Sequence, residues 1–552
     1  MGDLLKKGLL GLLLVVALVI AGCQSADEDS AATPEDSDAE ETDATEAEEE
    51  VEVEEEEEAE AEEDVATGGT LNIALDAPPP TLDWPSNPAT ATRDTARLIY
   101  ETLLTTTENF EVQPMLAESV ETDDNQTYTF KLREGIKFHN GQEMTSEDVV
   151  ASMERWLEQS TITGNIFIDA TWTAEDDYTV VLELKHPSSL TLDTLASAKQ
   201  AAIIMPKEAV EAAGAEEPEE HIGTGPFQFD EWQQDRHLIF KKFPDYQPRE
   251  EEADGLAGKR EALVDEIVFH MVPDTSTRIA GLQTGEYDFA FGMPYDNYDQ
   301  FENDPDFQTI LTPSANEFVG FNNVSGIASD FEMREAINVG IDYDEIMMAA
   351  FPNKDFYWLD AGYMDKHIEN WASTAGSEYH NINDPERAKE MLDEMGYDGE
   401  EFVVMTTRDY DHHYNVGVVF HDQLKQLGIN AVLDVYDWPT MTDNIQNDQD
   451  VWDVYVASAS TVSTPPQLIT LSPTWAGGVN NDHVVETIEA IEKAETLEEA
   501  REMWDDIQHY VWEEVVPTIN LGGYHSFFAA GNHVSGITTT SGPIFWNVSK
   551  SE

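Results

Sequence analysis

The sequence is poor in cysteine and in basic residues. Cys23 is the only cysteine among 552 residues, so the chain cannot form an internal disulfide. Lys and Arg total 28 against 113 Asp and Glu, which gives a formal net charge of −85 at pH 7. Such a chain has little with which to neutralise phosphates, which excludes nucleic acid as a partner. It also disfavours contact of the folded chain with anionic membrane surfaces.

Long apolar runs and catalytic motifs are also missing. The apolar run Leu9–Ile20 is shorter than the ~20 residues that a membrane-spanning helix needs. There is no Gly-x-Ser-x-Gly, no His-Glu-x-x-His and no second cysteine, and carboxylate pairs arise by chance in so acidic a chain. The sequence therefore predicts a protein that is not an enzyme and has no cofactor. A secreted hydrolase is the distant alternative.

The first residues have the pattern of an export signal. Lys6 and Lys7 precede the apolar run, and Ile20-Ala21-Gly22-Cys23 follows it and resembles a bacterial lipobox. We predict that residues 1–22 are a signal peptide and that Cys23 carries a lipid. The lipid would anchor the protein to the outer face of the cytoplasmic membrane or in the periplasm. The alternative is an ordinary cleaved signal with a chance cysteine.

Residues 23–64 are predicted to be a disordered acidic tether that follows the lipidated cysteine. Residues 24–64 contain 23 Asp or Glu and no Lys, Arg or aromatic residue, so they cannot bury enough apolar surface to offset their ordering entropy. A specific acidic interaction tail is the alternative. The acidic excess continues through residues 65–552. Because salt screens such self-repulsion, we expect a saline habitat, which could also be alkaline.

Residues 65–552 show the periodicities of an α/β protein. Alternating apolar residues predict strands at Thr70–Leu75, Tyr128–Arg133 and Tyr178–Leu184. Helical spacing is present at 92–104, 275–284 and 331–350. Further on, helices and strands alternate, as expected for parallel strands in an α/β fold. The alternating elements are helix 386–395, strand 402–407, helix 412–427, strand 430–435 and helix 497–513.

Short motifs spread along this region, in a fixed order, carry a family resemblance. The chain resembles the family 5 extracellular solute-binding proteins, which are the dipeptide, oligopeptide and nickel receptors of ABC importers. Each motif is weak alone, but the ordered set is specific and covers essentially all of 65–552. The motifs are Gly69-Thr70-Leu71, YETLL at 100–104, QPMLAES at 113–119, YTFKLREGIKFHNG at 128–141, TSEDVV at 145–150, GTGPF at 223–227, GLQTGEYDF at 281–289, REAI at 334–337 and Leu392–Gly396.

The resemblance implies a two-lobed, type II periplasmic-binding-protein-like fold with an accessory domain and a hinged ligand cleft. Lobe I would combine 65–105, 223–323 and 513–552, the accessory domain would be 106–222, and lobe II would be 324–512. It implies a monomeric receptor that captures a small solute, foremost a di- or oligopeptide, and delivers it to ABC permease subunits. An opine, a sugar, a modified amino acid or a nickel chelate is the alternative solute.

Two segments of lobe I are predicted to line the cleft. The first contains Thr90 and Arg93, and the guanidinium of Arg93 could pair with a ligand carboxylate. A solvated charge at a helix start is the alternative for Arg93. The second contains Phe291, Gly292 and Met293, where a glycine allows a ligand to approach the backbone closely. Core packing is the alternative for Phe291.

In lobe II, the loop after strand 402–407 is predicted to meet the ligand, because open α/β sheets bind ligands at the carboxyl ends of their strands. It contains Arg408, Tyr410 and His412. His412 and His413 are adjacent and point about 100° apart on a helix, with no third ligand spaced with them, so no metal site is predicted. Trp438 either stacks on the ligand or packs against the protein.

The segment 457–466 is the fourth predicted contact, through Ser458, Ser460 and Thr461. Peptide receptors of the resembled family have an aspartate here that holds the α-ammonium of the peptide, and Thr461 stands in its place. A neutral hydroxyl cannot replace that ion pair. Asp409 or Asp411 could supply the charge, or the hydroxyls could favour a polyol-like solute. We expect Thr461→Asp to improve binding of solutes with a free amine.

Overall fold

The computed structural model of the protein describes residues 66–475 and 477–551. The predicted signal peptide, the lipidation site Cys23 and the acidic tether lie outside the described residues and stay predictions. Helices and strands alternate through the described residues, as the predicted α/β class requires. No described helix is long and apolar enough to cross a membrane.

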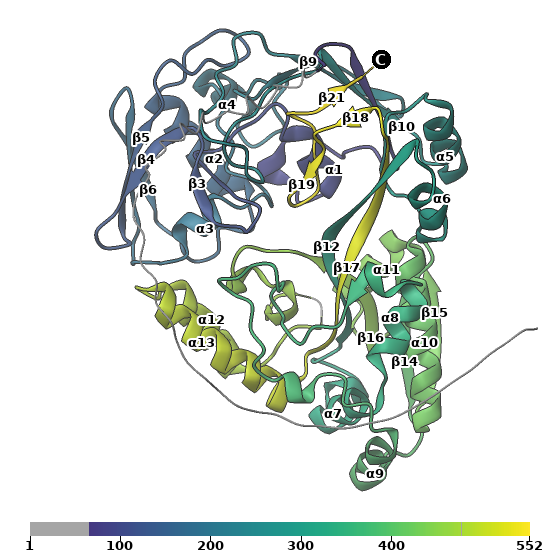
Figure 1. Ribbon diagram of the computed structural model, residues 1–552. Coiled ribbons are helices and arrows are strands. Elements are labelled where there is room, and N and C mark those ends of the chain that lie inside the picture. The colour runs from purple at the N-terminus through teal and green to yellow at the C-terminus, as the bar shows by residue number, and fades with distance from the viewer. Residues whose placement is uncertain (1–65, 476, 552) are drawn as a thin grey trace, which may run out of the picture. The chain divides into compact units, whose positions relative to one another are not determined.

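One large mixed sheet forms the framework (Figure 1). Its strand order is β15-β14-β16-β12-β17-β11-β1-β10-β9-β8, and β13 pairs with β17 off this path. Strand β14 is parallel to β15 and β16, and β1 is parallel to β10 and β11, whereas the remaining pairs are antiparallel. The strands are β1 Thr70–Leu75, β8 Phe227–Gln233, β9 His237–Lys242, β10 Glu266–Met271, β11 Phe289–Ala290, β12 Phe307–Phe321, β13 Tyr357–Trp358, β14 Glu401–Thr407, β15 Asn430–Tyr436, β16 Val454–Ser460 and β17 Thr518–Gly531.

Two long strands, β12 and β17, join the two halves of this sheet and run side by side between them (Figure 1). Their pairing shifts register between Pro313 and Ala315 and again between Glu317 and Phe318. We call the half with β11, β1, β10, β9 and β8 lobe I, and the half with β16, β14 and β15 lobe II. The predicted boundaries at 323 and 513 lie next to the ends of β12 and β17. Irregular pairing allows such a strand pair to bend.

Lobe I packs its helices around the apolar strand β1. The predicted helix 92–104 is wrong in its second half, because α1 ends at Ala96. The carbonyl groups of Ile99 and Glu101 instead accept hydrogen bonds from the N–H groups of Gly225 and Ile204, so this backbone pairs with distant segments. The helices of lobe I are α1 Thr90–Ala96, α5 Thr275–Thr284 and α6 Tyr298–Glu302, and the C-terminal segment adds the short strands β18 Val534–Ser535, β19 Thr538–Thr539, β20 Pro543–Ile544 and β21 Ser549–Lys550.

Lobe II confirms the predicted alternation of helices and strands in α9, β14, α10, β15 and α13, and α11 and β16 continue it. The predicted helix 331–350 is two helices, because the chain is extended at Ile341 and Asp342, and the Asp342 side chain caps the second helix by accepting from the Glu345 N–H. Trp438 begins α11 and does not end a strand. The helices are α7 Phe331–Gly340, α8 Tyr343–Ala350, α9 Pro385–Met395, α10 Asp411–Leu427, α11 Trp438–Asn447, α12 Asp482–Glu492 and α13 Leu497–Tyr510, with a π turn at Val511–Val515.

A second, four-stranded sheet lies in the region predicted to be the accessory domain. Its order is β4-β5-β7-β6, and the motif at 128–141 supplies its central strand β5. Helix α2 begins at a capping box in which Thr145 and Asp148 exchange hydrogen bonds, within the motif at 145–150. The elements are β2 Leu104–Thr106, β3 Val112–Pro114, β4 Ala117–Glu121, β5 Thr127–Leu132, α2 Ser146–Gln159, β6 Thr171–Asp176, β7 Thr179–Glu183, α3 Thr191–Leu195 and α4 Lys207–Ala213.

This region also contacts lobe II directly, at the end of α12. Its buried apolar residues and those of 462–515 belong to one hydrophobic cluster. Glu492 is buried and accepts hydrogen bonds from the backbone N–H (3.2 Å) and side-chain amide (2.7 Å) of Asn165. The Ser189 N–H donates to the carbonyl of Ala494 (2.9 Å). These contacts bridge the two lobes on the side opposite β12 and β17.

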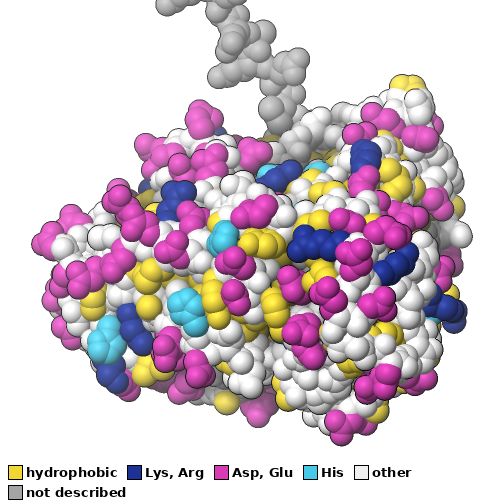
Figure 2. All heavy atoms as spheres, turned by 90° about the horizontal axis from the view of Figure 1, so that it is seen from below, with side chains coloured by type: hydrophobic (Ala, Val, Ile, Leu, Met, Phe, Trp, Pro, Cys, Tyr) yellow, Lys and Arg dark blue, Asp and Glu magenta, His cyan; other side chains and the backbone are white. Residues whose placement is uncertain are grey.

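Acidic side chains are spread over the face shown in Figure 2 rather than gathered in one patch. On the face shown, they alternate with small apolar areas and a few Lys and Arg side chains. The large negative charge is therefore carried on the solvated surface, where salt screens it.

Candidate ligand-binding cleft

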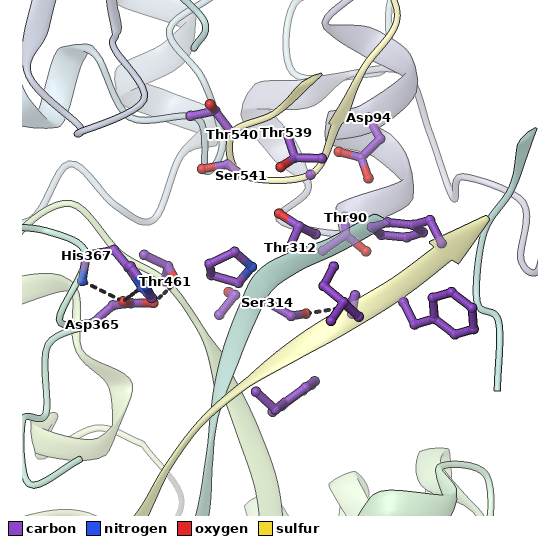
Figure 3. Close-up of a pocket in the computed structure, with 18 of the residues that line it drawn as sticks. Thr90, Asp94, Thr312, Ser314, Asp365, His367, Thr461, Thr539, Thr540 and Ser541 are labelled. Carbon is purple, nitrogen blue, oxygen red and sulfur yellow. Dashed lines mark hydrogen bonds and ion pairs between the residues drawn. The ribbon is translucent and has the colours of Figure 1, made fainter. Parts of the chain in front are cut away.

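A cavity of about 700 Å³ lies between the lobes, beside the crossing strands β12 and β17. Figure 3 shows that its wall is assembled from segments that are far apart in the sequence. Lobe I supplies α1, the loop after β11 and the segment 539–542, and lobe II supplies the segments at 365–369, 410–412 and 460–461. The middle of each crossing strand also lines the cavity, and so do residues 108–110 from the region predicted to be the accessory domain. A cavity of this size fits a small solute.

The predicted α1 contacts lie at the cavity. Thr90 is exposed at the start of the helix, and Arg93 follows one turn later. The Arg93 guanidinium is not free, because its Nε lies 2.8 Å from the carboxylate of Asp94, which also lines the cavity. Arg93 and Asp94 therefore present a charge pair to the solute instead of one positive charge.

The predicted segment Phe291–Met293 also lines the cavity. Phe291 is 6% exposed and packs edge-on against Phe289 and Phe528, so it belongs to the lobe I core as well as to the wall. Gly292 has a positive φ of 57°, and a Cβ there would lie 2.6 Å from the Asp76 carboxylate. A side chain at this position would collide with the acidic group beside it.

In lobe II, four of the predicted residues line the cavity, and they are Tyr410, His412, Ser460 and Thr461. Tyr410 is exposed and directly precedes α10, and His412 lies in the first turn of that helix. Ser460 ends β16, and Thr461 follows it. The loops after β14 and β16 thus meet at one end of the lobe II sheet.

Three other predicted residues do not line this cavity in the described structure. The Arg408 guanidinium lies over the ring of Tyr414, 4.7 Å from its centroid. Trp438 packs against Tyr410 and His413. The Ser458 hydroxyl lies behind the wall, 3.3 Å from the Tyr524 hydroxyl. The prediction that these three line the cleft is therefore not supported.

The carboxylate of Asp365, which was not identified from the sequence as a site residue, lies next to Thr461. The Thr461 hydroxyl donates to Oδ2 of Asp365 (2.9 Å), and His367 binds Oδ1 through its backbone N–H (2.9 Å) and its Nδ1 (2.7 Å). Burial alone would raise the pKa of Asp365, but the hydrogen bonds from His367 and Thr461 outweigh it, so the pKa is lowered. Asp365 is thus an ionised group beside the hydroxyl at 461 (Figure 3). Asp409, proposed for this role, instead accepts from the Trp438 N–H (2.7 Å).

The cavity holds charges of both signs. Asp76, Asp365 and Glu369 line it together with Lys366 and His367. The Lys366 ammonium lies 4.4 Å from the ring centroid of Trp358, which fixes its position near the wall. The 360–371 segment has no regular helix or strand, so its sequence carries no periodicity that could have marked it as part of the site.

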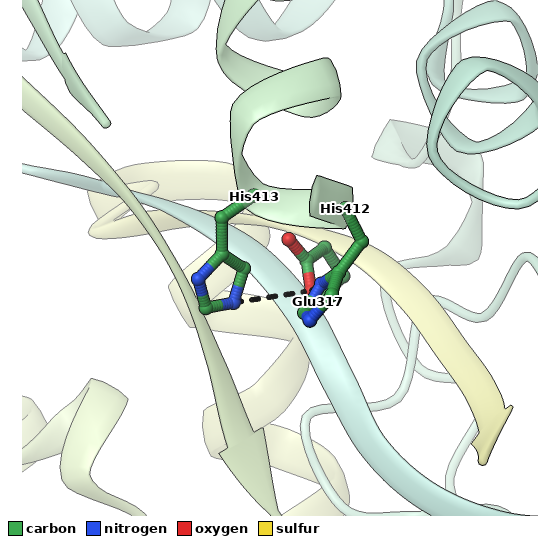
Figure 4. Close-up of side chains that lie close together, drawn as sticks. All are labelled: Glu317, His412 and His413. Atoms are coloured by element: carbon green, nitrogen blue, oxygen red, sulfur yellow. Dashed lines mark hydrogen bonds and ion pairs between the residues drawn. The ribbon is translucent and has the colours of Figure 1, made fainter. Parts of the chain in front are cut away.

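Behind His412, three ionisable side chains converge (Figure 4). Glu317 of β12 is fully buried. Its Oε2 atom lies 3.1 Å from Nδ1 of His412 and 3.7 Å from Nε2 of His413. Burial raises the pKa of Glu317, and His412 partly offsets this effect. Burial, together with the neighbouring His412, lowers the pKa of His413 far below its ordinary value. The prediction that no third ligand group accompanies the two histidines is wrong.

Comparison with known proteins agrees with the geometry. Residues 111–481 match the family described as bacterial extracellular solute-binding proteins, family 5 Middle. A probable peptide ABC transporter periplasmic-binding protein of Sinorhizobium fredii is 26% identical over 82% of this chain and 88% of its own length. The glutathione-binding protein GsiB of Escherichia coli K12 is 31% identical over 63% of this chain and 66% of its own length.

The fold is shared with solved structures. The periplasmic binding protein DppA from Helicobacter pylori, in complex with the peptide STSA, aligns with a TM-score of 0.73 and 21% identity. The alignment covers 88% of this chain and 99% of that protein. The family match over residues 111–481 shows that the chain belongs to the family 5 extracellular solute-binding proteins, which confirms the resemblance. The likeness to DppA confirms the two-lobed α/β fold predicted from the sequence.

Proposed function

We propose that this solute-binding protein captures di- or oligopeptides outside the cell and delivers them to the membrane subunits of an ABC importer. The observation that carries the peptide assignment is the ionised carboxylate of Asp365, hydrogen-bonded to Thr461 on the cavity wall. A buried carboxylate with hydrogen bonds left to accept is a suitable partner for an α-ammonium group. Lys366 on the same segment offers a positive charge for the other end of a zwitterion.

The family membership and the named functions of relatives support this proposal. The Sinorhizobium relative is named as a peptide transporter component, and the Helicobacter structure holds a tetrapeptide. Closure of the lobes around the solute would follow from bending of β12 and β17. Ligand binding favours the closed form only to the extent that the solute contacts both lobes.

Hydroxyl groups around the cavity favour a second candidate, a modified amino acid, an opine or a sugar. Thr312, Ser314, Ser460 and Thr461 all line the cavity. Such a solute would use these hydroxyls instead of the carboxylate of Asp365. A nickel chelate remains an alternative cargo, because the cavity could enclose its organic ligand.

Calorimetry with matched solutes tests the assignment. We expect a di- or tripeptide with a free amine to bind, and its N-acetylated form to bind at least about 10-fold more weakly, because the acetyl group removes the charge that Asp365 would meet. Asp365→Asn should abolish this difference. Glu369→Gln, which changes another carboxyl on the same wall, is the control. Binding of sugars or opines without any peptide binding would reject the peptide assignment.

We further propose that the protein is a monomer held at the membrane through a lipid on Cys23, with the acidic segment as a tether. The lipobox-like tetrapeptide and the single cysteine support this. Cys23→Ser should move the protein from the membrane fraction to the soluble fraction. A mass spectrum of the mature N-terminus without an added lipid would contradict the anchor.

A further inference from the structure

The cluster of Glu317, His412 and His413 has the ligand types and spacing of a metal centre. One ligand atom from each residue lies within 4.8 Å of the other two. The Oε2 atom of Glu317 lies between the histidines, 3.1 Å from one ring nitrogen and 3.7 Å from the other. In a tetrahedral site with metal–ligand bonds of about 2.1 Å, neighbouring ligand atoms lie roughly 3.4 Å apart. Small side-chain rotations would bring the three groups to that geometry.

The fold explains how two adjacent histidines can serve one site. Both lie in the first turn of α10, and their rings, with centroids 4.2 Å apart, flank the carboxylate that comes from β12 below them. Glu317 stands at the register shift between Glu317 and Phe318, where the pairing with β17 is irregular. Such an irregularity re-aims a side chain. The carboxylate therefore fills the space between side chains that would otherwise diverge.

The carboxylate lacks an ordinary counter-charge. Glu317 is fully buried, and among the described residues its ion-pair partners are the two imidazoles, with no Lys or Arg. Its Oε1 atom has no hydrogen-bond partner in the described structure, and neither does Nδ1 of the buried His413. A buried carboxylate without a fixed cation is costly unless a proton or a cation joins it.

We propose that Glu317, His412 and His413 bind one divalent transition-metal ion of the zinc, cobalt or nickel type. Two imidazole nitrogens and one carboxylate oxygen suit these ions, whereas Ca²⁺ and Mg²⁺ prefer a shell of oxygens. With three protein ligands, one coordination position stays open. His412 lines the solute cavity and the other two ligands are buried, so the open position is reached from the cavity by water or by a donor atom of the solute.

The alternative occupant of the site is a proton shared between His412 and Glu317. The two occupants differ in a measurable way, because a metal ion can be removed, counted and replaced. The metal site is also independent of the proposed peptide function. If the protein bound peptide but no metal, the peptide function would stand and the metal site would be rejected. If it bound metal but no peptide, the metal site would stand and the peptide function would be rejected.

The test uses the full chain without a histidine tag, stripped with EDTA and dialysed against Zn²⁺ or Co²⁺ at high salt. We expect one equivalent to be retained by elemental analysis, and Co²⁺ to give a visible absorption band that saturates at one equivalent. Glu317→Gln and His413→Gln should each weaken Zn²⁺ binding about 100-fold or more, because each removes a ligand. His483→Gln, an exposed histidine of α12, should bind as the unmodified protein does.

Circular dichroism of each variant shows whether the fold is retained, and Glu317→Gln keeps the shape of the side chain. Retention of no more Zn²⁺ than the EDTA-treated sample would overturn the proposal. So would tight binding that survives in a folded Glu317→Gln variant, because the metal would then sit elsewhere.

Discussion

At the scale of single residues, the carboxylate that was expected from the sequence near position 461 belongs to a different segment of the chain. Thr461 occupies the place where an aspartate was expected, and the carboxylate comes instead from Asp365, 96 residues earlier in the chain. The pair presents a hydroxyl and a carboxylate at one point of the cavity wall. An electrostatic contact can therefore survive the loss of its expected residue, if a neighbouring loop supplies the same group.

This geometry reverses the prediction made from the sequence for Thr461→Asp. A second carboxylate would lie within hydrogen-bonding distance of Asp365, and like charges so close cannot both ionise. We now expect binding of peptides with a free amine to weaken about 10-fold, because repulsion distorts the pair. Calorimetry at neutral pH measures the change. Thr461→Ser keeps the hydroxyl and is the control, and improved peptide binding by the aspartate variant would contradict this interpretation.

His139 makes stability depend on pH. Its Nδ1 accepts from the Gly223 N–H (3.2 Å) and its Nε2 binds the Gly225 carbonyl (3.1 Å), so the neutral ring satisfies both partners. Burial lowers the pKa of His139 to about 4. Between pH values of about 6.5 and 4 the unfolded chain binds a proton that the folded protein does not, so stability falls as pH falls through that window.

At pH of about 5 this ring should contribute a loss of about 2 kcal/mol relative to neutral pH. Urea unfolding at the two pH values measures it. His139→Gln should show a correspondingly smaller pH dependence, whereas His186→Gln, at an exposed position, should keep that of the unmodified protein. Equal pH dependence in all three proteins would show that His139 does not carry the effect.

At the scale of elements, the contact between α12 and the four-stranded-sheet region closes the side of the cleft away from β12 and β17. Glu492, 5% exposed, holds Asn165 by two hydrogen bonds, and a Cβ on Gly164 would lie 2.7 Å from the Glu492 carboxylate. This close fit requires both surfaces to be in place. We interpret the contact between Glu492 and Asn165, which we call the latch, as one that helps to hold the lobes together.

Glu492→Ala should weaken solute binding although Glu492 does not line the cavity. The substitution removes two hydrogen bonds to Asn165, but Asn165 is exposed and water can replace them, so the net loss is about 0.5–1.5 kcal/mol. If that loss falls on the closed form, affinity drops by up to about 10-fold. Calorimetry with a bound peptide measures it, and Glu495→Ala, an exposed neighbour, is the control. An unchanged affinity with an intact fold would show that the latch does not bias closure.

Local patterns predicted many of these elements. Helix α10 and strands β14 and β15 follow from side chains a few positions apart, and the structure confirms them. The break at Ile341 and the early end of α1 at Ala96 were missed. In both places the helical spacing of apolar residues continues past the end of the helix. The apolar residues that follow are buried against other segments of the chain, so their spacing resembles that of a helix although they do not belong to one.

At the scale of the whole molecule, the acidic surface sets the conditions of stability. The full chain has a net charge of −85, of which residues 65–552 carry −63, so the folded part repels itself unless ions screen it. We expect the melting temperature to rise substantially between roughly 0.1 M and 2 M KCl, because the Debye length falls over that range. Differential scanning fluorimetry measures it. Sucrose at matched osmolality is the uncharged control, and equal melting temperatures at both salt concentrations would reject the expected saline habitat.

The sequence by itself determined the family, the α/β class and four of the segments that line the cavity. These properties rest on near-neighbour patterns and on motif order, which need no knowledge of the fold. Only the tertiary structure decided which side chains meet at the cleft. Asp365 with Thr461, and Glu317 with His412, are 96 and 95 residues apart. Sheet register and loop packing bring such pairs together, and no periodicity within a short window records that contact.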